Sequence, residues 1–299
     1  MSPDRARVRV PATTANLGPG FDTLGLALTL YNEVELAVAE ATSVQTSGEG
    51  ASALAPDRGH LVLVSADRLA VQIGRAVPGW RLTQVNRIPL ARGLGSSSAA
   101  IVAGLVAANH LLQAGLSLPE LLGLAAAIEG HPDNVAPALY GGLTVCCANG
   151  TTCCVPFPAP ALKVVVAIPD FEVSTEAARK VMPRQIPFAD GAFNTAHAAM
   201  TLAALVSGDF EKLGCAMRDR LHQPYRAHLV PGFEQTMAAA TDAGAYGACL
   251  SGSGPSIAAF CEDQAEAIAA AMVAALLQAG VQARSLVLDV DPEGAKVLD

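Results

Sequence analysis

A short run of glycine and serine, Gly93-Leu-Gly-Ser-Ser-Ser98, is the segment of the chain best suited to bind phosphate. It follows an expected strand, Leu82 to Ile88, and precedes a small, apolar stretch that continues in a helical pattern to about Leu112. Glycine lets a backbone approach a phosphate closely, and the free N–H groups of a first helical turn point toward such a ligand. Serine hydroxyls add hydrogen bonds or bind a phosphate-bound Mg²⁺.

Two widespread phosphate motifs do not fit this run. No lysine follows it, as G-x-x-x-x-G-K-[ST] would require, and Ser98 stands at the third glycine of G-x-G-x-x-G. By chemistry alone, the segment also suits an ordinary helix cap with packing glycines. Arg87 and Arg92 flank the run, and we expect their charges to add to an anion site.

The composition makes such a local anion site necessary. Hydrophobic residues form 52% of the 299 residues and charged residues 15%, which excludes a disordered chain and a coiled coil and suits one large or two modest domains. The net charge of −8 and the isoelectric point near 5.2 argue against nucleic acid and anionic membrane as partners. An anionic ligand therefore needs a local site of positive character that outweighs the overall negative charge of the protein.

The mean hydropathy of +0.37 is high, but no membrane span is expected. The longest apolar run, Ala99 to Ala108, has about ten residues, whereas a spanning helix needs roughly 20. It is therefore predicted to be a buried core helix. The first ten residues lack a hydrophobic signal core, so the sequence predicts a cytoplasmic protein.

Four of the seven cysteines lie in an expected hairpin, Leu143 to Val155, around the turn Asn149-Gly150. Adjacent residues of a strand point to opposite faces, so these four thiols do not easily converge on one metal. We therefore favour buried or half-buried free thiols over a zinc site.

The elements that must position the glycine run are visible in the sequence pattern. Strands are expected at Arg5–Val10 and Asn32–Val38, joined by a long loop, Pro11–Asp22, rich in Gly, Pro, Thr and Asn. Ser117 and Glu120 form a capping box for a helix that ends at Gly130.

The segment Val155–Pro160 has three prolines and marks the boundary between the two halves of the chain. Beyond it, the pattern of strand, helices, two strands, helix and strand resembles a split βαβ arrangement. The expected elements are strands at Lys163–Ile168, Ala245–Leu250, Ser256–Cys261 and Ala283–Val290, and helices at Asn194–Val206, Asp209–Arg220, Phe233–Ala243 and Asp263–Ala279.

Four ordered blocks resemble the superfamily of galactokinases, homoserine kinases, mevalonate kinases and phosphomevalonate kinases. The run Pro89-x-x-x-Gly93-Leu-Gly-Ser-Ser-Ser-Ala-Ala100 is similar to its ATP-binding loop, and Leu250-Ser-Gly-Ser-Gly-Pro-Ser256 to its carboxy-terminal glycine motif. The block Pro11–Asp22 is similar to the first motif of homoserine kinases in particular, as is His131–Ala138. The blocks extend over nearly the whole chain.

The resemblance implies an α+β fold of two lobes. The amino-terminal lobe, residues 1–157, would be the ATP-binding domain with a ribosomal protein S5 domain 2-like fold and a left-handed crossover. The carboxy-terminal lobe, residues 158–299, would be ferredoxin-like. ATP and substrate would meet between them. A homodimer is compatible with the sequence, which does not fix the oligomeric state.

The reaction implied is ATP plus L-homoserine giving ADP plus O-phospho-L-homoserine, a step of threonine biosynthesis. Residues of the glycine run would hold the nucleotide, and Ser97 and Glu129 would bind Mg²⁺ through oxygen ligands. The implied nucleotide-binding residues are Pro89, Leu90, Ala91, Arg92, Gly93, Leu94, Gly95, Ser96, Ser97 and Ser98. His60 stands where homoserine kinases often have an asparagine near the adenine, so the contacts to the base stay open.

Homoserine carries an ammonium, a carboxylate and a hydroxyl, which need partners of opposite charge close together. The resemblance places substrate contacts at Asn16, Asp22 and His131, with Asp22 suited to the ammonium or the hydroxyl. It implies Arg179 and Arg226 as partners of the carboxylate, which a planar guanidinium matches with two hydrogen bonds. Thr175 is expected near the transferred phosphate.

The catalytic base is less defined. Asn134 stands where the related mevalonate kinases would have an aspartate, and an amide takes no proton at neutral pH. We therefore predict that no strong general base exists and that the hydroxyl loses its proton late or to the phosphate. Asp22 and His131 are the alternatives.

Two other functions remain open from the sequence. One is a related kinase that phosphorylates another small alcohol, although an isoprenoid precursor would not need the two arginines. The other is a nucleotide- or metabolite-binding module without catalysis, against which the retained Ser97 and Glu129 argue.

Overall fold

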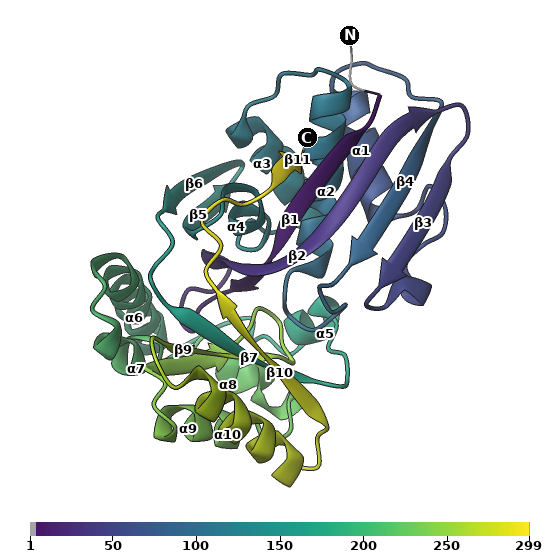
Figure 1. Cartoon of the computed structure of the whole chain (residues 1–299). Helices are drawn as coiled ribbons and strands as arrows, with labels where there is room; N and C mark the ends of the chain where they lie inside the picture. The colour runs from purple at the N-terminus through teal and green to yellow at the C-terminus, as the bar shows by residue number, and fades with distance from the viewer. Residues whose placement is uncertain (1–3, 299) are drawn as a thin grey trace.

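The computed structural model describes residues 4–298 and shows two lobes, each built on one sheet (Figure 1). The amino-terminal lobe contains a seven-stranded sheet with the core order β11-β1-β2-β4-β3, and β5 and β6 join it at one end of β2. Its strands are β1 (Ala6–Ala15), β2 (Leu24–Ala39), β3 (Ser43–Gly48), β4 (Gly79–Asn86), β5 (Leu143–Asn149), β6 (Thr151–Phe157) and β11 (Lys296–Leu298). Only β3 and β4 among the described pairs of this sheet run parallel, joined through α1.

Helix α2 (Ser96–Leu111) packs against β1 and β2, between α1 (Leu61–Gln72) and α3 (Leu118–Glu129). It is buried on nearly every side, including almost all of the apolar run Ala99 to Ala108. A helix with neighbours all around needs no polar face, so α2 contributes apolar residues to the high mean hydropathy of the chain. The short helix α4 (Val135–Tyr140) packs against α2 and α3 and against the strands β1, β2 and β5.

The carboxy-terminal lobe has a four-stranded antiparallel sheet of β7 (Lys163–Pro169), β8 (Gly247–Leu250), β9 (Ile257–Cys261) and β10 (Ala283–Asp289). Its order β10-β7-β9-β8 is that of a split βαβ arrangement, as the sequence pattern predicts. Its helices are α5 (Thr175–Lys180), α6 (Phe188–Ser207), α7 (Leu213–Ala216), α8 (Gln223–Arg226), α9 (Phe233–Asp242) and α10 (Ala265–Gln278). The two-lobe α+β fold is thus confirmed.

Strand β7 connects two hydrophobic cores. Val164, Val166 and Ile168 belong to the core shared with the amino-terminal lobe, whereas Val165 and Ala167 face α9 and α10. Because successive side chains of a strand point to opposite faces, a strand covered on both faces is apolar throughout. The first of these two cores contains residues of both lobes, so it joins the lobes and holds the walls of the space between them in place.

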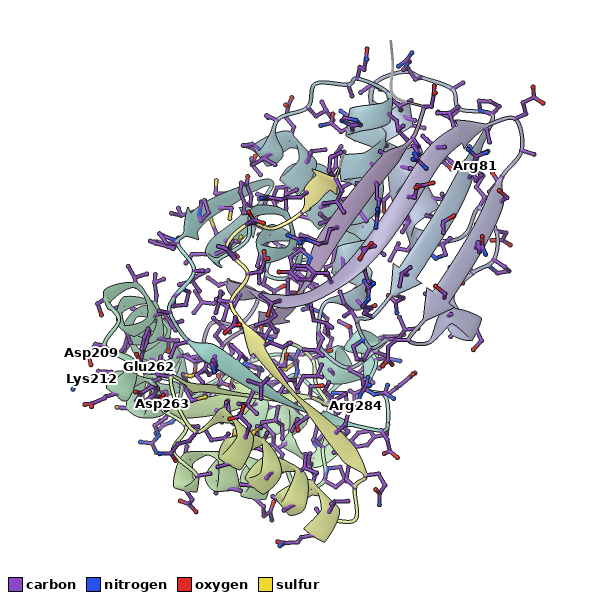
Figure 2. The ribbon with its side chains drawn as sticks, in the orientation of Figure 1. Arg81, Asp209, Lys212, Glu262, Asp263 and Arg284 are labelled. Atoms are coloured by element: carbon purple, nitrogen blue, oxygen red, sulfur yellow. The ribbon has the colours of Figure 1, made fainter. Side chains whose placement is uncertain are left out.

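The end of the chain returns to the first lobe. Strand β11 pairs with β1, with Val8 opposite Val297. The expected carboxy-terminal domain, residues 158–299, therefore includes a strand that belongs to the amino-terminal sheet. An ion pair between Glu49 and Arg284, which Figure 2 labels on β10, also crosses the lobes. The boundary near residue 157 otherwise stays a prediction.

Two local expectations were wrong. Strand β1 continues through Pro11 to Ala15, where it pairs with Leu28 to Gly25 after an irregular register, so the loop is shorter than Pro11–Asp22. The helix expected at Asp209–Arg220 is a short 3₁₀ turn followed by α7, and the chain then leaves the helical conformation. Its residues instead build a turn around Asp219, whose carboxylate accepts the N–H groups of Leu221, His222 and Gln223.

Within the described residues, no helix is long and apolar enough to cross a membrane. The predicted cysteine hairpin is present as β5 and β6. Its thiols differ from the expected buried or half-buried state, because Cys147 and Cys153 are exposed while Cys146 is buried and Cys154 is half-buried.

Candidate active site

The glycine run forms a tight loop between β4 and α2. Gly93 and Gly95 have φ angles of 71° and 68°, in the left-handed region that favours glycine. A Cβ on Gly95 would lie 1.9 Å from Thr13 Oγ1, and one on Gly93 would lie 2.1 Å from the Ser251 carbonyl oxygen. Gly95 is also the N-cap residue of α2, so the N–H groups of the first helical turn face the open side of the loop.

The carboxy-terminal glycine motif supports the back of this loop. Ser251 Oγ donates a hydrogen bond of 2.6 Å to the Gly93 carbonyl, and it lies 2.9 Å from the Thr14 hydroxyl. The Gly252 N–H donates to the Ala15 carbonyl. The sequence motif Leu250–Ser256 thus acts by fastening the second lobe to the loop of the first.

Ser97 and Glu129 lie together at the start of α2 and the end of α3. Ser97 Oγ donates to Glu129 Oε1 at 2.6 Å, and the buried Ser98 donates to the same oxygen at 2.8 Å. A hydroxyl and a carboxylate are hard oxygen donors of the kind Mg²⁺ prefers, and this cation usually takes only one or two protein ligands beside phosphate and water. The pair predicted from the sequence therefore fits such a cation.

The two flanking arginines do not supply free charge to the loop, contrary to our expectation. Arg92 donates to the carbonyls of Leu90, Pro169 and Asp170, with Glu172 also 3.2 Å away. Arg87 pairs with Glu33 at 3.1 Å. Both guanidinium groups are engaged with protein oxygen atoms, so the positive character of the loop comes mainly from its backbone N–H groups.

The loop after β1 holds the expected substrate residues in an unusual backbone conformation. Asn16, Leu17 and Gly18 have φ angles of 71°, 44° and 80°, and Asp22 has one of 54°. The Asn16 side chain secures this shape, because its amide donates to the Gly252 carbonyl and its Oδ1 accepts the Asp22 N–H. Both the amide NH₂ and the amide oxygen of the Asn16 side chain are therefore hydrogen-bonded within the protein, and Asn16 positions Asp22.

Asp22 and Arg179 bind each other across the lobes. Arg179 Nη2 lies 2.8 Å from Asp22 Oδ1 and Nη1 lies 3.1 Å from Oδ2, a bidentate pair. Arg179 comes from α5, whose N-cap Ser174 accepts the Ala177 N–H. Both charged side chains are more than a third exposed, so the pair is open to exchange with a ligand.

Arg226 is the buried cation of the site, with 2% of its surface exposed. Among the described residues it makes no ion pair, and it donates to the Ala178 and Gly252 carbonyls. Its guanidinium also lies over the Phe21 ring, 5.1 Å from the centroid. Burial and the nearby Arg179 lower the pKa of Arg226. A buried cation without a carboxylate partner is an attractive site for an anion.

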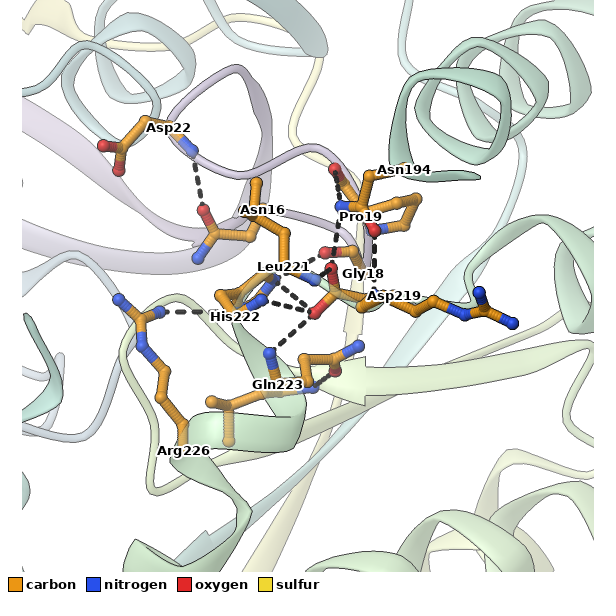
Figure 3. Close-up of polar contacts among 12 residues, drawn as sticks. Asn16, Gly18, Pro19, Asp22, Asn194, Asp219, Leu221, His222, Gln223 and Arg226 are labelled. Atoms are coloured by element: carbon orange, nitrogen blue, oxygen red, sulfur yellow. Dashed lines mark hydrogen bonds and ion pairs between the residues drawn. The ribbon is translucent and has the colours of Figure 1, made fainter. Parts of the chain in front are cut away.

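A chain of polar contacts orients Arg226 (Figure 3). His222 Nε2 donates to the Gly18 carbonyl at 2.6 Å, so its Nδ1 is left to accept from Arg226 at 3.4 Å. Burial lowers the pKa of His222, which favours this neutral tautomer. Asp219 in turn fixes the backbone N–H of His222 and binds the Asn194 amide.

His131, Asp133 and Asn134 form the facing wall. His131 Nδ1 lies 2.6 Å from Asp133 Oδ1. Burial alone would lower the pKa of His131, but the hydrogen bond and charge of Asp133, with Glu129, outweigh it and raise this pKa overall. The Asn134 Oδ1 accepts a hydrogen bond of 2.8 Å from Thr13 Oγ1, so the NH₂ group of Asn134 is not used in this contact.

Six buried side-chain polar atoms lack a hydrogen-bond partner within the part of the chain described, and two of them, His60 Nε2 and Gln84 Oε1, belong to residues of the cavity. His60 Nδ1 accepts the Val62 N–H at the start of α1, so Nε2 must carry the proton. Gln84 donates its amide to Asn86, which leaves its carbonyl oxygen free. One donor and one acceptor are therefore left without partners on residues that line the same cavity.

These residues surround a cavity of about 370 Å³ between the lobes. It brings together nearly all of the residues predicted from the sequence, and only Pro89 and Ser98 do not line it. The lining includes Asn16, Asp22, Leu90, Ala91, Arg92, Gly93, Leu94, Gly95, Ser96, Ser97, Glu129, His131, Asn134, Thr175, Arg179 and Arg226.

Sequence reasoning did not assign Gln84, Asp133, Asp219 or His222. Gln84 lies on a strand that is expected only from its apolar alternation, where a polar residue looks like solvent-facing surface. Asp133 belongs to the block that carries His131, so the motif itself contained the signal. Asp219 lies within the expected helix Asp209–Arg220 and His222 lies just after it. Nothing local in the sequence reveals the hydrogen bonds of Asp219 to the following turn or that of His222 to Gly18 of the first lobe.

Comparison with known proteins identifies the family of the chain. The family models for the GHMP kinases N terminal domain and the GHMP kinases C terminal match residues 60–142 and 201–278. The homoserine kinase of Desulfitobacterium hafniense is 45% identical over 98% of this chain and 99% of its own length. That of Trichormus variabilis is 46% identical, with 94% and 96% covered.

Solved structures show the same similarity. The crystal structure of homoserine kinase from Cytophaga hutchinsonii superposes with a TM-score of 0.90 at 33% identity, covering all of this chain and 98% of that one. The mevalonate kinase of L. major has a TM-score of 0.72 at 19% identity, covering 95% of each chain. The latter likeness concerns the fold alone.

Proposed function

Since the chain belongs to the homoserine kinase family of the GHMP kinases, we propose that it transfers the terminal phosphoryl group of ATP to the hydroxyl of L-homoserine. The products are ADP and O-phospho-L-homoserine, an intermediate of threonine biosynthesis. One observation carries the proposal: a glycine-lined helix N-terminus and a buried Arg226, which makes no ion pair with any described residue, line the same cavity. The first suits a polyphosphate and the second the carboxylate of an amino acid. The need for ATP supports a cytoplasmic location.

The nucleotide is proposed to lie with its phosphates on the loop from Gly93 to Ser98. Phosphoryl transfer asks a protein mainly for positioning and for neutralisation of charge. Ser97 and Glu129 would hold Mg²⁺, which supplies part of that neutralisation when bound. The backbone N–H groups of α2 supply the remainder without a lysine.

We propose that His60 and Gln84 contact the base of the nucleotide. Adenine offers a ring nitrogen acceptor beside an amino donor, which complements a His60 N–H donor and a Gln84 carbonyl acceptor. The neighbouring Leu54, Leu61 and Ala100 provide apolar surface for the ring. Gln84→Leu should raise the KM for ATP roughly tenfold by removing one buried hydrogen bond. The exposed Gln45→Leu is the control and should leave it unchanged.

The amino acid is proposed to insert its opposite charges between Asp22 and the two arginines. Asp22 and Arg179 satisfy each other before the substrate arrives. An ammonium on Asp22 and a carboxylate on Arg179 and Arg226 exchange that pair for new ones, so no charge is left unpartnered. The substrate hydroxyl then points toward the phosphates, near Thr175.

The site supports a reaction without a strong general base. Asn134 is an amide whose oxygen accepts a hydrogen bond. Asp22 is bound at both oxygens by Arg179 before the substrate arrives, and in the proposed complex it is held by the substrate ammonium. The raised pKa of His131 favours its protonated form, which cannot accept a proton. We therefore infer that the hydroxyl proton leaves late, or to the transferred phosphate.

The activity is tested by ADP release with homoserine, mevalonate and threonine measured in parallel. We expect ADP release that depends on homoserine and is negligible with mevalonate. Equal release with mevalonate would favour the related alcohol kinase. ATP binding without ADP release from any of the three would favour a binding module without catalysis.

The role of Asp22 is tested by Asp22→Asn. If Asp22 orients the ammonium, the KM for homoserine should rise by at least ~tenfold while kcat stays within a few-fold. A collapse of kcat at every pH would instead identify Asp22 as the base and overturn the base-free reaction, leaving the substrate assignment intact.

A further inference from the structure

The hairpin of β5 and β6 carries two cross-strand pairs of cysteines. Its register places Cys146 opposite Cys154 and Cys147 opposite Cys153. Because adjacent residues of a strand point to opposite faces, the two pairs lie on different sides of the hairpin. This agrees with their burial: Cys147 and Cys153 are exposed, Cys146 is buried and Cys154 is half-buried.

The two pairs differ in backbone geometry. The Cys146 N–H donates to the Thr23 carbonyl at 2.9 Å, so the backbone of Cys146 points toward the first strands and away from β6. Cys146 and Cys154 are therefore a non-hydrogen-bonded pair, in which the Cα atoms are about 4.5 Å apart and the side chains are closest. Cys147 and Cys153 form the wider, hydrogen-bonded pair, at about 5.5 Å. A disulfide needs Cβ atoms only about 3.5–4.5 Å apart, which favours the first pair.

The environment also makes the two thiols of the inner pair, Cys146 and Cys154, unequal, whereas Cys147 and Cys153 form the exposed outer pair. The hydrogen bond between them lowers the pKa of Cys154 and, together with burial, raises the pKa of Cys146. Cys154 is the thiol that solvent can reach, whereas Cys146 is enclosed in the core. An accessible thiol of lowered pKa beside a buried partner is the usual arrangement of an attacking and a resolving cysteine.

We propose that Cys146 and Cys154 form a dithiol–disulfide modification site that exchanges with small disulfides such as oxidised glutathione. The Cys154 thiolate attacks one sulfur of the small disulfide, whose S–S bond breaks and releases one thiol. Cys146 then gives up its proton and attacks Cys154 Sγ, which releases the second thiol. The protein dithiol loses two protons and two electrons, and the small disulfide gains them and becomes two thiols.

The site is joined by one backbone hydrogen bond to the loop that carries Asp22, which is proposed to bind the amino acid. Cys146 is bonded through its backbone to Thr23, the residue that follows Asp22 in the chain. The inner pair itself takes no part in the proposed catalysis, so its variants test the modification separately from the activity.

The test uses the full chain in mixtures of oxidised and reduced glutathione, with trapping of free thiols by iodoacetamide and mass spectrometry. No lysine or arginine lies between Arg92 and Lys163, so all four hairpin cysteines fall in one tryptic peptide. Fragmentation of that peptide locates the modified thiols, and variants assign the pair independently. Two matched double variants do so: Cys147→Ser with Cys153→Ser keeps the inner pair, and Cys146→Ser with Cys154→Ser keeps the outer pair.

The inner-pair protein should form the internal disulfide at a ratio of oxidised to reduced glutathione at least ~tenfold lower than the outer-pair protein. Cys146→Ser alone should accumulate a glutathione adduct on Cys154, because the resolving thiol is missing. The wild-type chain should lose the same two thiols, which keeps the test valid if a variant does not fold. A disulfide between Cys147 and Cys153, a stable adduct on wild-type Cys154, or full alkylation of Cys146 and Cys154 at every ratio would overturn the proposal.

Discussion

The two ends of the cavity are built from different parts of the protein. The end proposed to bind phosphate uses the backbone of one continuous segment, in which Gly93 and Gly95 leave no room for a side chain. The end proposed to bind the amino acid uses charged side chains from separate segments, of which Asp22 and Arg179 are 157 residues apart. Binding at the first end should therefore be lost when a Cβ is added to a glycine. Binding at the second end should be lost when a charged group is replaced by one of the same sign but different shape.

The largest effect is expected from Gly95→Ala. Its Cβ would overlap Thr13 Oγ1 at 1.9 Å, so the loop must shift away from the position that binds phosphate. We expect kcat/KM for ATP to fall by at least ~100-fold, as expected when a positioning element moves by about 1 Å. Steady-state kinetics with varied ATP measure this.

Gly115→Ala is the matched control, because Gly115 has a φ of 67° with nothing within 4 Å of its would-be Cβ. It carries the same backbone strain and should lose about 1 kcal/mol of stability with activity retained. Equal losses of activity in both variants would mean that strain, and not the close approach, explains the role of glycine.

The next effect is expected from Arg226→Lys, which keeps the positive charge but loses the planar fork. We expect the KM for homoserine to rise by at least ~30-fold, since changing one partner of a buried charged pair costs about 2 kcal/mol or more. The KM for ATP should change less than about twofold.

Arg220→Lys provides the comparison for Arg226, because Arg220 is an exposed arginine that pairs with Asp190 at 3.1 Å. It should leave both KM values near those of the wild type. A parallel rise in the KM for ATP and homoserine in Arg226→Lys would contradict the division of the cavity into two ends.

The smallest effect concerns the pH dependence of His131. Its pKa in the folded protein is raised above the ordinary 6.5, so folding favours the protonated ring. The stabilisation is complete below about pH 6.5 and is lost as the pH rises through the raised value. Asp133→Asn should therefore lower the free energy of unfolding by about 1.5 kcal/mol at about pH 6 and by less at about pH 9. Urea unfolding at each pH measures it.

The exposed Asp57→Asn serves as the reference for this pH series, because the Asp57 side chain accepts the Gly59 N–H and, among the described residues, makes no ion pair with a histidine. Its cost should be the same at both pH values. A difference for Asp133→Asn that grows as the pH rises would show that the pair favours the neutral ring instead.

The same division explains what could be predicted. The strands, the central helix and the phosphate loop follow from local patterns, because glycines, caps and apolar periodicity act within a few residues. The prediction of a helix at Asp209–Arg220 was wrong because the Asp219 carboxylate binds three backbone N–H groups of the turn that follows. A helix-propensity pattern contains no information on such side-chain-to-backbone hydrogen bonds. The return of β11 to β1 depends on contacts between the two ends of the chain.

By itself the sequence determined the glycine run before a helix and the strand order of the second lobe, and its resemblance to a kinase superfamily implied the two-lobed architecture and most of the residues around the cavity. Only the tertiary structure decided how those residues pair. It joined Asp22 to Arg179, enclosed Arg226 without a carboxylate and left His60 and Gln84 with one free donor and one free acceptor. Such pairings depend on distances across the fold that are fixed by packing of the shared core, and no short stretch of sequence encodes a distance.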